Sequence, residues 1–455
     1  RLFPASISRE VIMTTLKDAD EAVLELVSHN LSMDGCLVRR EQDLSKIEFV
    51  TPEPNKEYND YVYQLSDALS AILLDMNELS TSLMDDLNDH FVEAGDPEQY
   101  IVNMFRKEHP NAKFNFDDAK LGLKVNMLNF ASRLYDVQRQ FLLAIKTGSA
   151  IETAINCLNN SKKPVISLES TGESVFNRLM AYKLNTPDKK GQTLSDLENE
   201  ITRLQMQIKH AEESDKVTTK LQKELDGYVN RRSERIKEYL ADFDHPPLFK
   251  EILLMMLDSM NKAKIIDQDG NYIELIVGDG NPAYDEQREL IRKKINDYPD
   301  LPFMPIDIMR NEIRKAGYTI DEIAGTTVRL LQNHETGRWH AETRKSNDIG
   351  DRVRTVADFQ SGKLDALIIT RSGSTGISLH ALESKNPDIP SDHLRQRVLI
   401  VAQLPLEIVE FMQTLGRVDR RGQYSSPQII TLSSCIPAET RINMMHMRKL
   451  ALLSA

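Results

Sequence analysis

The feature that most constrains this chain is the alternation of short apolar runs with helical segments in its last third. In order these are a helical segment at 349–360, an apolar run at 364–370, a second run at 398–403, a helical segment at 406–415 and a third run at 428–432. Strands separated by helices pair in parallel through crossover connections. The alternation therefore predicts an α/β fold built on a mostly parallel sheet, whose ligands bind at the carboxyl ends of the strands.

Strand-like stretches also occur upstream. Residues 164–168 (Pro-Val-Ile-Ser-Leu) form a short apolar, β-branched run that ends in the polar sequence Glu-Ser-Thr-Gly. This pattern is typical of a buried strand that runs into a loop. Nearer the start, a helical stretch at 18–31 precedes a short alternating stretch at 46–50.

Most of the remaining sequence has helical spacing. Residues 58–159 place apolar side chains at three- and four-residue steps, and further helices are predicted at 285–297 and 307–317. The acidic segment Asp321–Ala324 is assigned to a helical stretch. A helix is the wrong setting for the strand-end carboxylate that holds magnesium in nucleotide hydrolases, so no magnesium site is expected there.

Residues 184–243 have the spacing of a coiled coil. The apolar residues that step by 3, 4, 3 and 4 positions are Leu194, Leu197, Ile201, Leu204 and Ile208. They form a heptad seam, and an apolar stripe resumes after the polar segment 212–215. The simplest interpretation is an antiparallel coiled-coil hairpin over 192–242. Such an arm either braces two domains or grips a protein or nucleic-acid partner, and the sequence leaves both open.

Composition excludes several classes of protein. Of the 455 residues, 40% are hydrophobic and 28% charged, as in globular proteins rather than disordered ones. The three cysteines (Cys36, Cys157 and Cys435) lie far apart with no Cys-x-x-Cys pair, so neither a disulfide framework nor a zinc site is expected. No run of about 18 apolar residues predicts a membrane span, and a reducing cytosol is the expected compartment.

Charge is distributed unevenly along the chain. The net charge is −12, yet residues 341–455 carry 15 Lys and Arg residues against 12 Asp and Glu residues. An anionic partner is therefore expected to bind the C-terminal quarter.

The first segment with chemical content is Thr370–His380, which directly follows an apolar run. Its sequence, Thr-Arg-Ser-Gly-Ser-Thr-Gly-Ile-Ser-Leu-His, combines small and hydroxyl side chains with two glycines. Such a backbone approaches an anion closely and donates N–H groups to it. The alternative is a tight strand-to-helix turn without a ligand.

The second segment is Glu410–Gln423, with the sequence Glu-Phe-Met-Gln-Thr-Leu-Gly-Arg-Val-Asp-Arg-Arg-Gly-Gln. Gln413, Arg417 and Arg420 stand at i, i+4 and i+7 and are expected to share one helical face, whereas Arg421 points elsewhere. Guanidinium groups on one face suit bidentate contact with a triphosphate. The alternative is a solvated basic face.

Together these two segments resemble motifs V and VI of superfamily-two helicases and translocases. The motif VI pattern Gln-x-x-Gly-Arg-x-x-Arg is matched by Gln413, Gly416, Arg417 and Arg420. Three further stretches resemble the strawberry notch family in particular: 165–173 (Val-Ile-Ser-Leu-Glu-Ser-Thr-Gly-Glu), 301–307 (Leu-Pro-Phe-Met-Pro-Ile-Asp) and 35–49. The resemblance covers about 300–436 strongly and is absent from the helical insertions.

One part of the family pattern is missing from the sequence. No Gly-x-x-x-x-Gly-Lys-Ser/Thr phosphate loop occurs, although a working motor needs one. The resemblance, together with the start at Arg1, implies the second half of a motor whose first RecA-like lobe lies elsewhere. ATP is the implied nucleotide, and the Mg²⁺ ligands are expected on that first lobe.

The resemblance implies a RecA-like parallel-sheet lobe with large α-helical insertions. It divides the chain into linker and first lobe elements at 1–55, a helical insertion at 56–159, a core strand and loop at 160–183, an insertion with the hairpin at 184–300, and the lobe core at 301–455.

It also implies roles for individual residues. Arg417 and Arg420 are the expected arginine fingers, with Gln413 orienting the γ-phosphate or the attacking water. Nucleotide contacts are expected from Gly376, Ser378 and Gly416. Nucleic-acid contacts are expected from Ser170, Thr171, Gly172, Arg371, Ser372, Ser374 and Thr375.

The implied function is the second lobe of an ATP-dependent helicase or translocase. Its partners would be nucleic acid, with DNA preferred over RNA, the first lobe, and a protein bound through the helical arms, but no membrane. Its compartment would be cytoplasmic in a prokaryote or phage and nuclear in a eukaryote. The alternative is a non-catalytic scaffold built on a degenerate helicase lobe.

Overall fold

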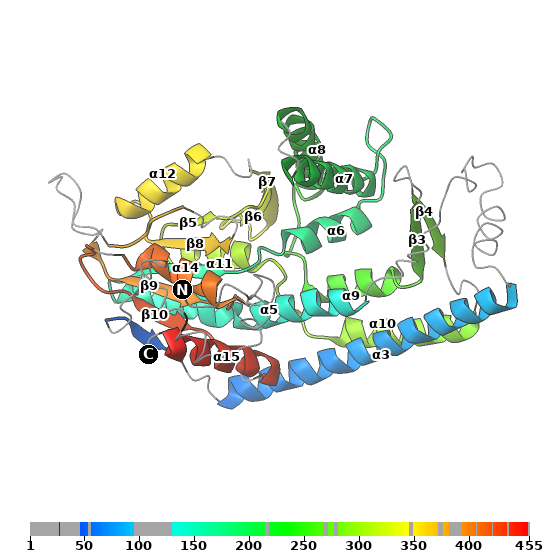
Figure 1. Ribbon diagram of the computed structural model, residues 1–455, viewed down its shortest axis with the longest axis horizontal. Helices are drawn as coiled ribbons and strands as arrows, with labels where there is room; N and C mark the ends of the chain where they lie inside the picture. The colour runs from blue at the N-terminus through cyan, green and yellow to red at the C-terminus, as the bar shows by residue number, and fades with distance from the viewer. Residues whose placement is uncertain are drawn as a thin grey trace, which may run out of the picture. The chain divides into compact units, whose positions relative to one another are not determined.

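The computed structural model describes residues 27, 46–52, 56–94, 130–213, 218–266, 272–276, 281–344, 349–371, 376–381, 394–405, 407–420, 422–434 and 436–453. By its internal contacts the chain divides into two units: Arg1–Lys46 with Ser454–Ala455, and Ile47–Leu453. Only residues 27 and 46 of the first unit are described, so the helix predicted at 18–31 lies outside the described residues except for residue 27, which is helical. The elements that follow belong to the second unit (Figure 1).

A six-stranded sheet organises this unit, in the order β1-β10-β9-β2-β8-β5. Its strands are β1 (Glu48–Val50), β2 (Lys163–Leu168), β5 (Ile320–Ile323), β8 (Ala366–Thr370), β9 (Arg397–Val401) and β10 (Gln428–Thr431). Every neighbouring pair is parallel. Val165 of the central strand β2 lies opposite Leu367 on one side and Leu399 on the other. The predicted α/β fold with a parallel sheet is confirmed.

The edge strand β5 corrects one prediction. The segment Asp321–Ala324 is not helical, because Ile320–Ile323 pairs with Ala366–Ile369 of β8. Pairing with a preformed neighbouring strand overrides the weak local preference of four residues. Glu322 is buried and forms ion pairs with Arg310 and Arg344, so its carboxylate is occupied within the fold.

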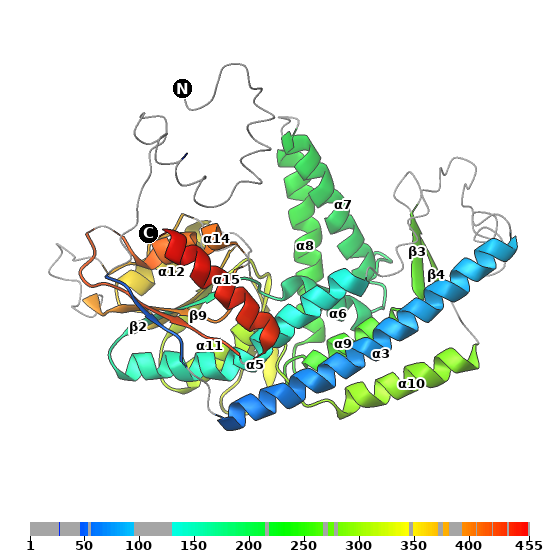
Figure 2. The same ribbon diagram turned by 60° about the horizontal axis from the view of Figure 1, so that its bottom comes forward.

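Helices cover both faces of the sheet. On one face, α5 (Phe130–Asn159) and α11 (Pro305–Lys315) pack against alternate strand residues such as Ile166 and Ile368. On the other face lie α12 (Ile349–Gln360) and α14 (Ile408–Val418), as Figure 2 shows. The helix α15 (Pro437–Leu453) follows the last strand. The helices α11, α12 and α14 confirm the segments predicted from helical spacing.

A second hydrophobic core lies among helices beyond the sheet. Its elements are α3 (Lys56–Ala94), the first half of α5, α6 (Glu173–Lys183), α9 (Phe249–Asp258), α10 (Pro282–Asp297) and the antiparallel hairpin β6–β7 (Val328–Gln332 and Trp339–Thr343). A further hairpin, β3–β4 (Lys262–Ile266 and Tyr272–Ile276), follows α9. Asn281 caps α10 by accepting a hydrogen bond from the Ala283 N–H, and Pro282 occupies the first helical position. Because α5 contributes to both cores, it links the sheet to this helical layer.

The predicted coiled-coil hairpin is present as α7 (Leu194–Glu213) and α8 (Thr219–Tyr239). Ile201, Leu204 and Ile208 pack against Leu225, which buries the heptad seam. The buried Arg232 anchors the base: it pairs with Glu198 of α7 at 2.9 Å and donates to the Thr327 hydroxyl at 3.2 Å. The Thr327 N–H donates in turn to Glu173, the first residue of α6, at 2.7 Å. The hairpin is therefore tied to the end of the 170–172 loop.

One helix has the length and apolar composition of a membrane span. This is the segment Asp136–Asn159 of α5, of which just over half is buried within the fold. Its apolar residues lie in the two cores, as expected of a central helix in a packed protein.

Candidate nucleotide and nucleic-acid site

The loops after three adjacent strands meet at the carboxyl edge of the sheet and form a cleft. Leu168 ends β2 and Glu169 follows it, Thr370 ends β8 and Arg371 follows it, and Gln403 follows β9. The far wall is α14, which contributes Glu407, Val409, Glu410, Gln413, Thr414 and Arg417. This is the edge at which parallel sheets bind ligands. The cleft brings together three residues predicted from the sequence: Arg371, Gln413 and Arg417.

Two carboxylates that the sequence analysis did not include also lie in this cleft. Glu410 forms an ion pair with Arg371, and Glu169 forms one with Arg139 of α5 at 2.6 Å. Burial raises the pKa of Glu169, and the nearby Glu410 raises it further, whereas Arg139 and Arg371 oppose the shift. Each of these two carboxylates is therefore paired with an arginine.

The 170–172 loop is held by side chains rather than by regular structure. The Gln403 carboxamide oxygen accepts hydrogen bonds from the N–H groups of Glu169 and Ser170, both at 3.2 Å. The Ser170 hydroxyl accepts from the Gly172 N–H at 3.2 Å, and the Thr171 hydroxyl accepts from the Glu173 N–H at 3.2 Å. Gly172 has φ +73°, and a Cβ there would lie 3.3 Å from the Gln140 side chain, so glycine is needed.

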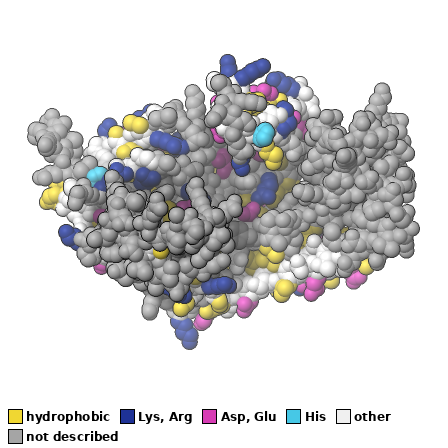
Figure 3. All heavy atoms as spheres, viewed as in Figure 1, with side chains coloured by type: hydrophobic (Ala, Val, Ile, Leu, Met, Phe, Trp, Pro, Cys, Tyr) yellow, Lys and Arg dark blue, Asp and Glu magenta, His cyan; other side chains and the backbone are white. Residues whose placement is uncertain are grey.

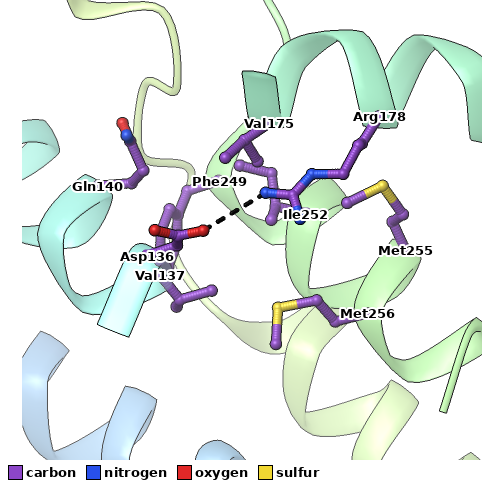
Figure 4. A pocket seen from close by; sticks show the side chains of 9 residues that line it. All are labelled: Asp136, Val137, Gln140, Val175, Arg178, Phe249, Ile252, Met255 and Met256. Atoms are coloured by element: carbon purple, nitrogen blue, oxygen red, sulfur yellow. Dashed lines mark ion pairs between the residues drawn. The ribbon is translucent and has the colours of Figure 1, made fainter. Parts of the chain in front are cut away.

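A small pocket borders this loop through Gln140 (Figure 4). Its other lining residues are Asp136, Val137, Val175, Arg178, Phe249, Ile252, Met255 and Met256, which come from α5, α6 and α9. The only ion pair drawn there joins Arg178 and Asp136 at 3.5 Å, with both side chains half exposed. Most of its lining side chains are apolar and come from the helical core.

Arg417 and Arg420 converge on one atom, although not by the geometry predicted. The helix α14 ends at Val418, so Arg420 does not share a helical face with Gln413 and Arg417. The chain turns out of the helix at Asp419, and the Arg420 Nε bonds back to the Gly416 carbonyl at 3.1 Å. Both guanidinium groups donate to the Ile377 carbonyl oxygen, Arg417 at 3.4 Å and Arg420 at 3.3 Å.

These two arginines carry positive charge without a neutralising carboxylate. Neither forms an ion pair in the described part of the chain, and the Nε of Arg417 is buried without a hydrogen-bond partner there. Burial lowers the pKa of Arg417, and the adjacent Arg420 lowers it further. An anion placed between them would relieve this repulsion and fill the empty donor, so the site fits a phosphate group.

The remaining predicted residues divide into two groups. Gly376 (φ +82°) and Ser378 lie on the described loop 376–381, and the Ser378 carbonyl accepts a hydrogen bond from Gln360. Ser372, Ser374 and Thr375, like Arg421, lie outside the described residues. Arg371 is largely exposed next to this gap.

The described residues contain no group of three or more His, Cys, Asp or Glu side chains that could hold a metal ion. Glu169 and Glu410 are each paired with an arginine. These two residues do not fit a magnesium site, because each carboxylate is already paired with a cation.

On the face drawn in Figure 3, Lys and Arg side chains lie in the region of α12 and, together with Asp and Glu side chains, on the α7–α8 hairpin; Asp and Glu side chains also lie along α3 and α10.

Residues 313–455 match the family described as the C-terminal domain on Strawberry notch homologue. With its parallel sheet and its arginines at the carboxyl edge, this part of the chain is a RecA-like α/β lobe of the helicase C-terminal type. It is similar to the strawberry notch C-terminal helicase domain, and the chain has distant similarity to the strawberry notch homologues.

Curated relatives show the same distant similarity. Protein strawberry notch homolog 1 of Gallus gallus is 26% identical over 176 residues, which span 38% of this chain and 14% of that protein. Protein strawberry notch of Drosophila melanogaster is 27% identical over 172 residues, or 37% of this chain and 10% of that protein. This chain thus matches only a small fraction of the length of these relatives.

Among solved structures, the C-terminal part of the Fun30 ATPase domain aligns with 63% of this chain and 89% of its own. The identity is 13% and the TM-score is 0.23, which is too low to transfer any property.

Proposed function

We propose that this chain provides the second motor lobe of an ATP-dependent, nucleic-acid-dependent helicase or translocase. The observation that carries the proposal is the convergence of Arg417 and Arg420 on one carbonyl oxygen with no carboxylate partner in the described residues. Two guanidinium groups in this arrangement stabilise the charge that develops during phosphoryl transfer.

Each part of the cleft has a role in this proposal. Arg417 and Arg420 act as arginine fingers on ATP, and Gln413, exposed on the same helix, orients the γ-phosphate or the attacking water. Gly376, Ser378 and Gly416 lie beside the nucleotide. A first RecA-like lobe supplies the phosphate loop and the Mg²⁺ ligands.

The nucleic-acid strand lies along the loops after β2 and β8. Ser170, Thr171, Gly172, Arg371, Ser372, Ser374 and Thr375 contact its phosphates, and such contacts hold a strand without reading its bases. DNA is the preferred substrate over RNA. A protein partner binds through the helical arms, and the compartment is the nucleus if the source is eukaryotic, like the matched relatives, or the cytoplasm if it is prokaryotic or viral.

The test is nucleic-acid-stimulated ATP hydrolysis by the full-length reading frame. Replacing Arg417 or Arg420 by Ala is expected to reduce turnover by about 10³–10⁵-fold because each removes an arginine finger. Binding of a fluorescent ATP analogue is expected to persist, since the first lobe holds the phosphates.

The matched control is Arg354→Ala. Arg354 is an exposed arginine of α12 whose one ion-pair partner among the described residues is Asp351, three residues away, and it does not line the cleft. Its loss is expected to leave turnover within twofold of the wild-type value. A protein that hydrolyses no ATP with any DNA or RNA, or that tolerates Arg420→Ala, would favour the scaffold alternative.

A further inference from the structure

Four consecutive carbonyl groups of the 376–381 loop are held by side chains. The Ile377 oxygen accepts from Arg417 and Arg420. The Gln360 Nε2 donates to the oxygens of Ser378 at 3.1 Å and His380 at 3.2 Å. The remaining oxygen, that of Leu379, accepts from Nε of Arg397 at 2.8 Å. A loop with so many side-chain contacts to its backbone is fixed in one conformation.

Gln360 and Arg397 are also fixed relative to each other. The Arg397 Nη2 donates to the Gln360 carboxamide oxygen at 2.8 Å, and its Nη1 donates to the Arg395 carbonyl at 2.9 Å. Because a guanidinium group only donates, the Gln360 oxygen must face Arg397 and its NH₂ group must face the loop. The Arg397 guanidinium carbon also lies 5.2 Å from the centre of the Phe359 ring.

Burying the Arg397 guanidinium group in the core costs desolvation free energy. It is fully buried at the start of β9 and forms no ion pair with a carboxylate in the described residues. Burial and the neighbouring Arg395 lower its pKa to about 10. Its hydrogen bonds go to neutral oxygens. The buried cation is therefore stabilised by contacts with the loop and with Gln360, which itself bonds the loop.

The loop is joined to α14 by its backbone as well. The Leu379 N–H donates to the Arg417 carbonyl oxygen at 2.7 Å. The Leu379 carbonyl oxygen thus accepts a hydrogen bond from the Arg397 side chain, and the Leu379 N–H donates one to the backbone of Arg417, a proposed arginine finger. Any displacement of the loop displaces Arg417 with it.

We propose that Gln360 and Arg397 are positioning residues that hold the 376–381 loop in one conformation. The loop in turn holds the guanidinium groups of Arg417 and Arg420 in a common orientation. It also couples a nucleic-acid strand bound beside it to the cleft. This inference rests on the proposed function for its effect on turnover. Neither residue touches the nucleotide or the nucleic acid; both act through the loop.

The test is Gln360→Glu in the full-length reading frame. Glutamate has the shape of glutamine and keeps its oxygen on Arg397, but it replaces the NH₂ donor by a second acceptor facing two carbonyl oxygens. Nucleic-acid-stimulated turnover is expected to fall by about 10²-fold, the effect of misplacing catalytic groups by about 1 Å. The KM for ATP is expected to stay within about twofold, because the phosphates are held by the first lobe.

Amide hydrogen exchange provides a readout that does not need activity. In Gln360→Glu the Leu379 N–H is expected to exchange at least about tenfold faster, while the amides of β2 and β9 keep their wild-type rates. General destabilisation would instead accelerate all of them. The matched control is Gln396→Ala, which removes a carboxamide one residue before Arg397 that bonds the Ser426 carbonyl and does not touch the loop.

Each outcome supports or overturns the clamp. Selective exchange at Leu379 together with the loss of stimulated turnover supports it, whereas a turnover and an exchange rate within twofold of wild type overturn it. If Gln360→Glu does not fold, Gln360→Met, which is apolar and similar in length, replaces it in both measurements. If the wild-type protein hydrolyses no ATP, the proposed function fails and the exchange measurement still decides the clamp.

Discussion

Two clusters of arginines in this unit differ in the partners of their guanidinium groups: carboxylates in one cluster and uncharged oxygens in the other. In the carboxylate cluster (Asp307, Arg310, Glu322 and Arg344), Arg310 is fully buried and pairs with both Asp307 and Glu322, while Arg344 pairs with Glu322 at 2.8 Å. In the carbonyl cluster (Arg397, Arg417 and Arg420), every hydrogen bond that the three guanidinium groups make to described residues goes to an uncharged oxygen.

The difference separates a cluster whose charges balance within the fold from one whose positive charge is not balanced by a carboxylate among the described residues. The carboxylate cluster joins α11 to β5 and to the β6–β7 hairpin, and its two anions match its two cations. The carbonyl cluster keeps its positive charge, which attracts an anion but contributes less to folding. Removing a member of each cluster should therefore have opposite consequences for stability and binding.

The largest expected effect is on stability, in the carboxylate cluster. Arg310→Ala leaves Asp307 and one oxygen of Glu322 buried without their cation, so the free energy of unfolding is expected to fall by about 3–5 kcal/mol. Denaturant unfolding followed by fluorescence or circular dichroism measures this change.

The contrast between the clusters would be contradicted if Arg417→Ala lowered the free energy of unfolding as much as Arg310→Ala does. That variant removes a half-buried cation with no partner carboxylate, so its free energy of unfolding is expected to stay within about 0.5–1 kcal/mol of wild type. A loss of about 3 kcal/mol or more would make the carbonyl cluster structural as well.

The second prediction concerns anion binding by the carbonyl cluster. Inorganic triphosphate at about 100 times its Kd is expected to stabilise the folded protein by about 2.7 kcal/mol. The stabilisation should disappear when Arg417 and Arg420 are both replaced by Ala and persist in Arg354→Ala. Thermal unfolding with and without triphosphate measures it, and equal stabilisation of the double variant would place the anion elsewhere.

The smallest expected effect is a pH dependence at His380. Burial, with help from Arg420 and Arg397, lowers the pKa of His380 below its ordinary value of 6.5. Below that pH the unfolded chain binds a proton that the folded protein does not, so protons favour unfolding. Stability is therefore constant above the ordinary value and falls as the pH drops from it towards the lowered pKa.

The measurement compares wild type with His380→Gln by denaturant unfolding at about pH 7.5 and about pH 5.5. The acid-induced loss should be smaller in the variant, by up to about 1.4 kcal/mol for each pKa unit of the shift. An identical loss in both proteins would assign the pH dependence to other groups.

Much of the sheet could be predicted from the sequence because its inner strands carry their signal locally. The runs that became β2, β8 and β9 are apolar and β-branched, and each is buried along its whole length. The strand β5 has only four residues with two acidic side chains, and it forms because β8 supplies its hydrogen-bonding edge. The β6–β7 hairpin was missed as well, since neither of its five-residue strands has strong alternation.

The candidate site divides in the same way. Gln413, Arg417 and Arg420 carry a sequence pattern, and the structure brings Arg417 and Arg420 to one oxygen atom. Glu169, Glu410 and Gln403 had one usable signal each: Glu169 and Gln403 lie at the end of a predicted strand, and Glu410 begins the segment that contains motif VI. The contacts that Gln360 and Arg397 make with the loop had no such signal, because residues 360, 379 and 397 meet only after the chain has crossed the sheet.

The order of strands in the sheet also has a consequence for how the molecule is made. Both partners of the central strand β2 lie about 200 residues further along the chain, since Val165 pairs with Leu367 and Leu399. At about 5–20 residues per second, a ribosome needs about 10–40 s to complete that interval. During this time β2, which is buried at every position in the finished sheet, has neither neighbour to pair with. Contacts between residues so far apart also fold slowly. A nascent chain of this design depends on its helical layer, or on a chaperone, to keep β2 from aggregating until its neighbours have been synthesised.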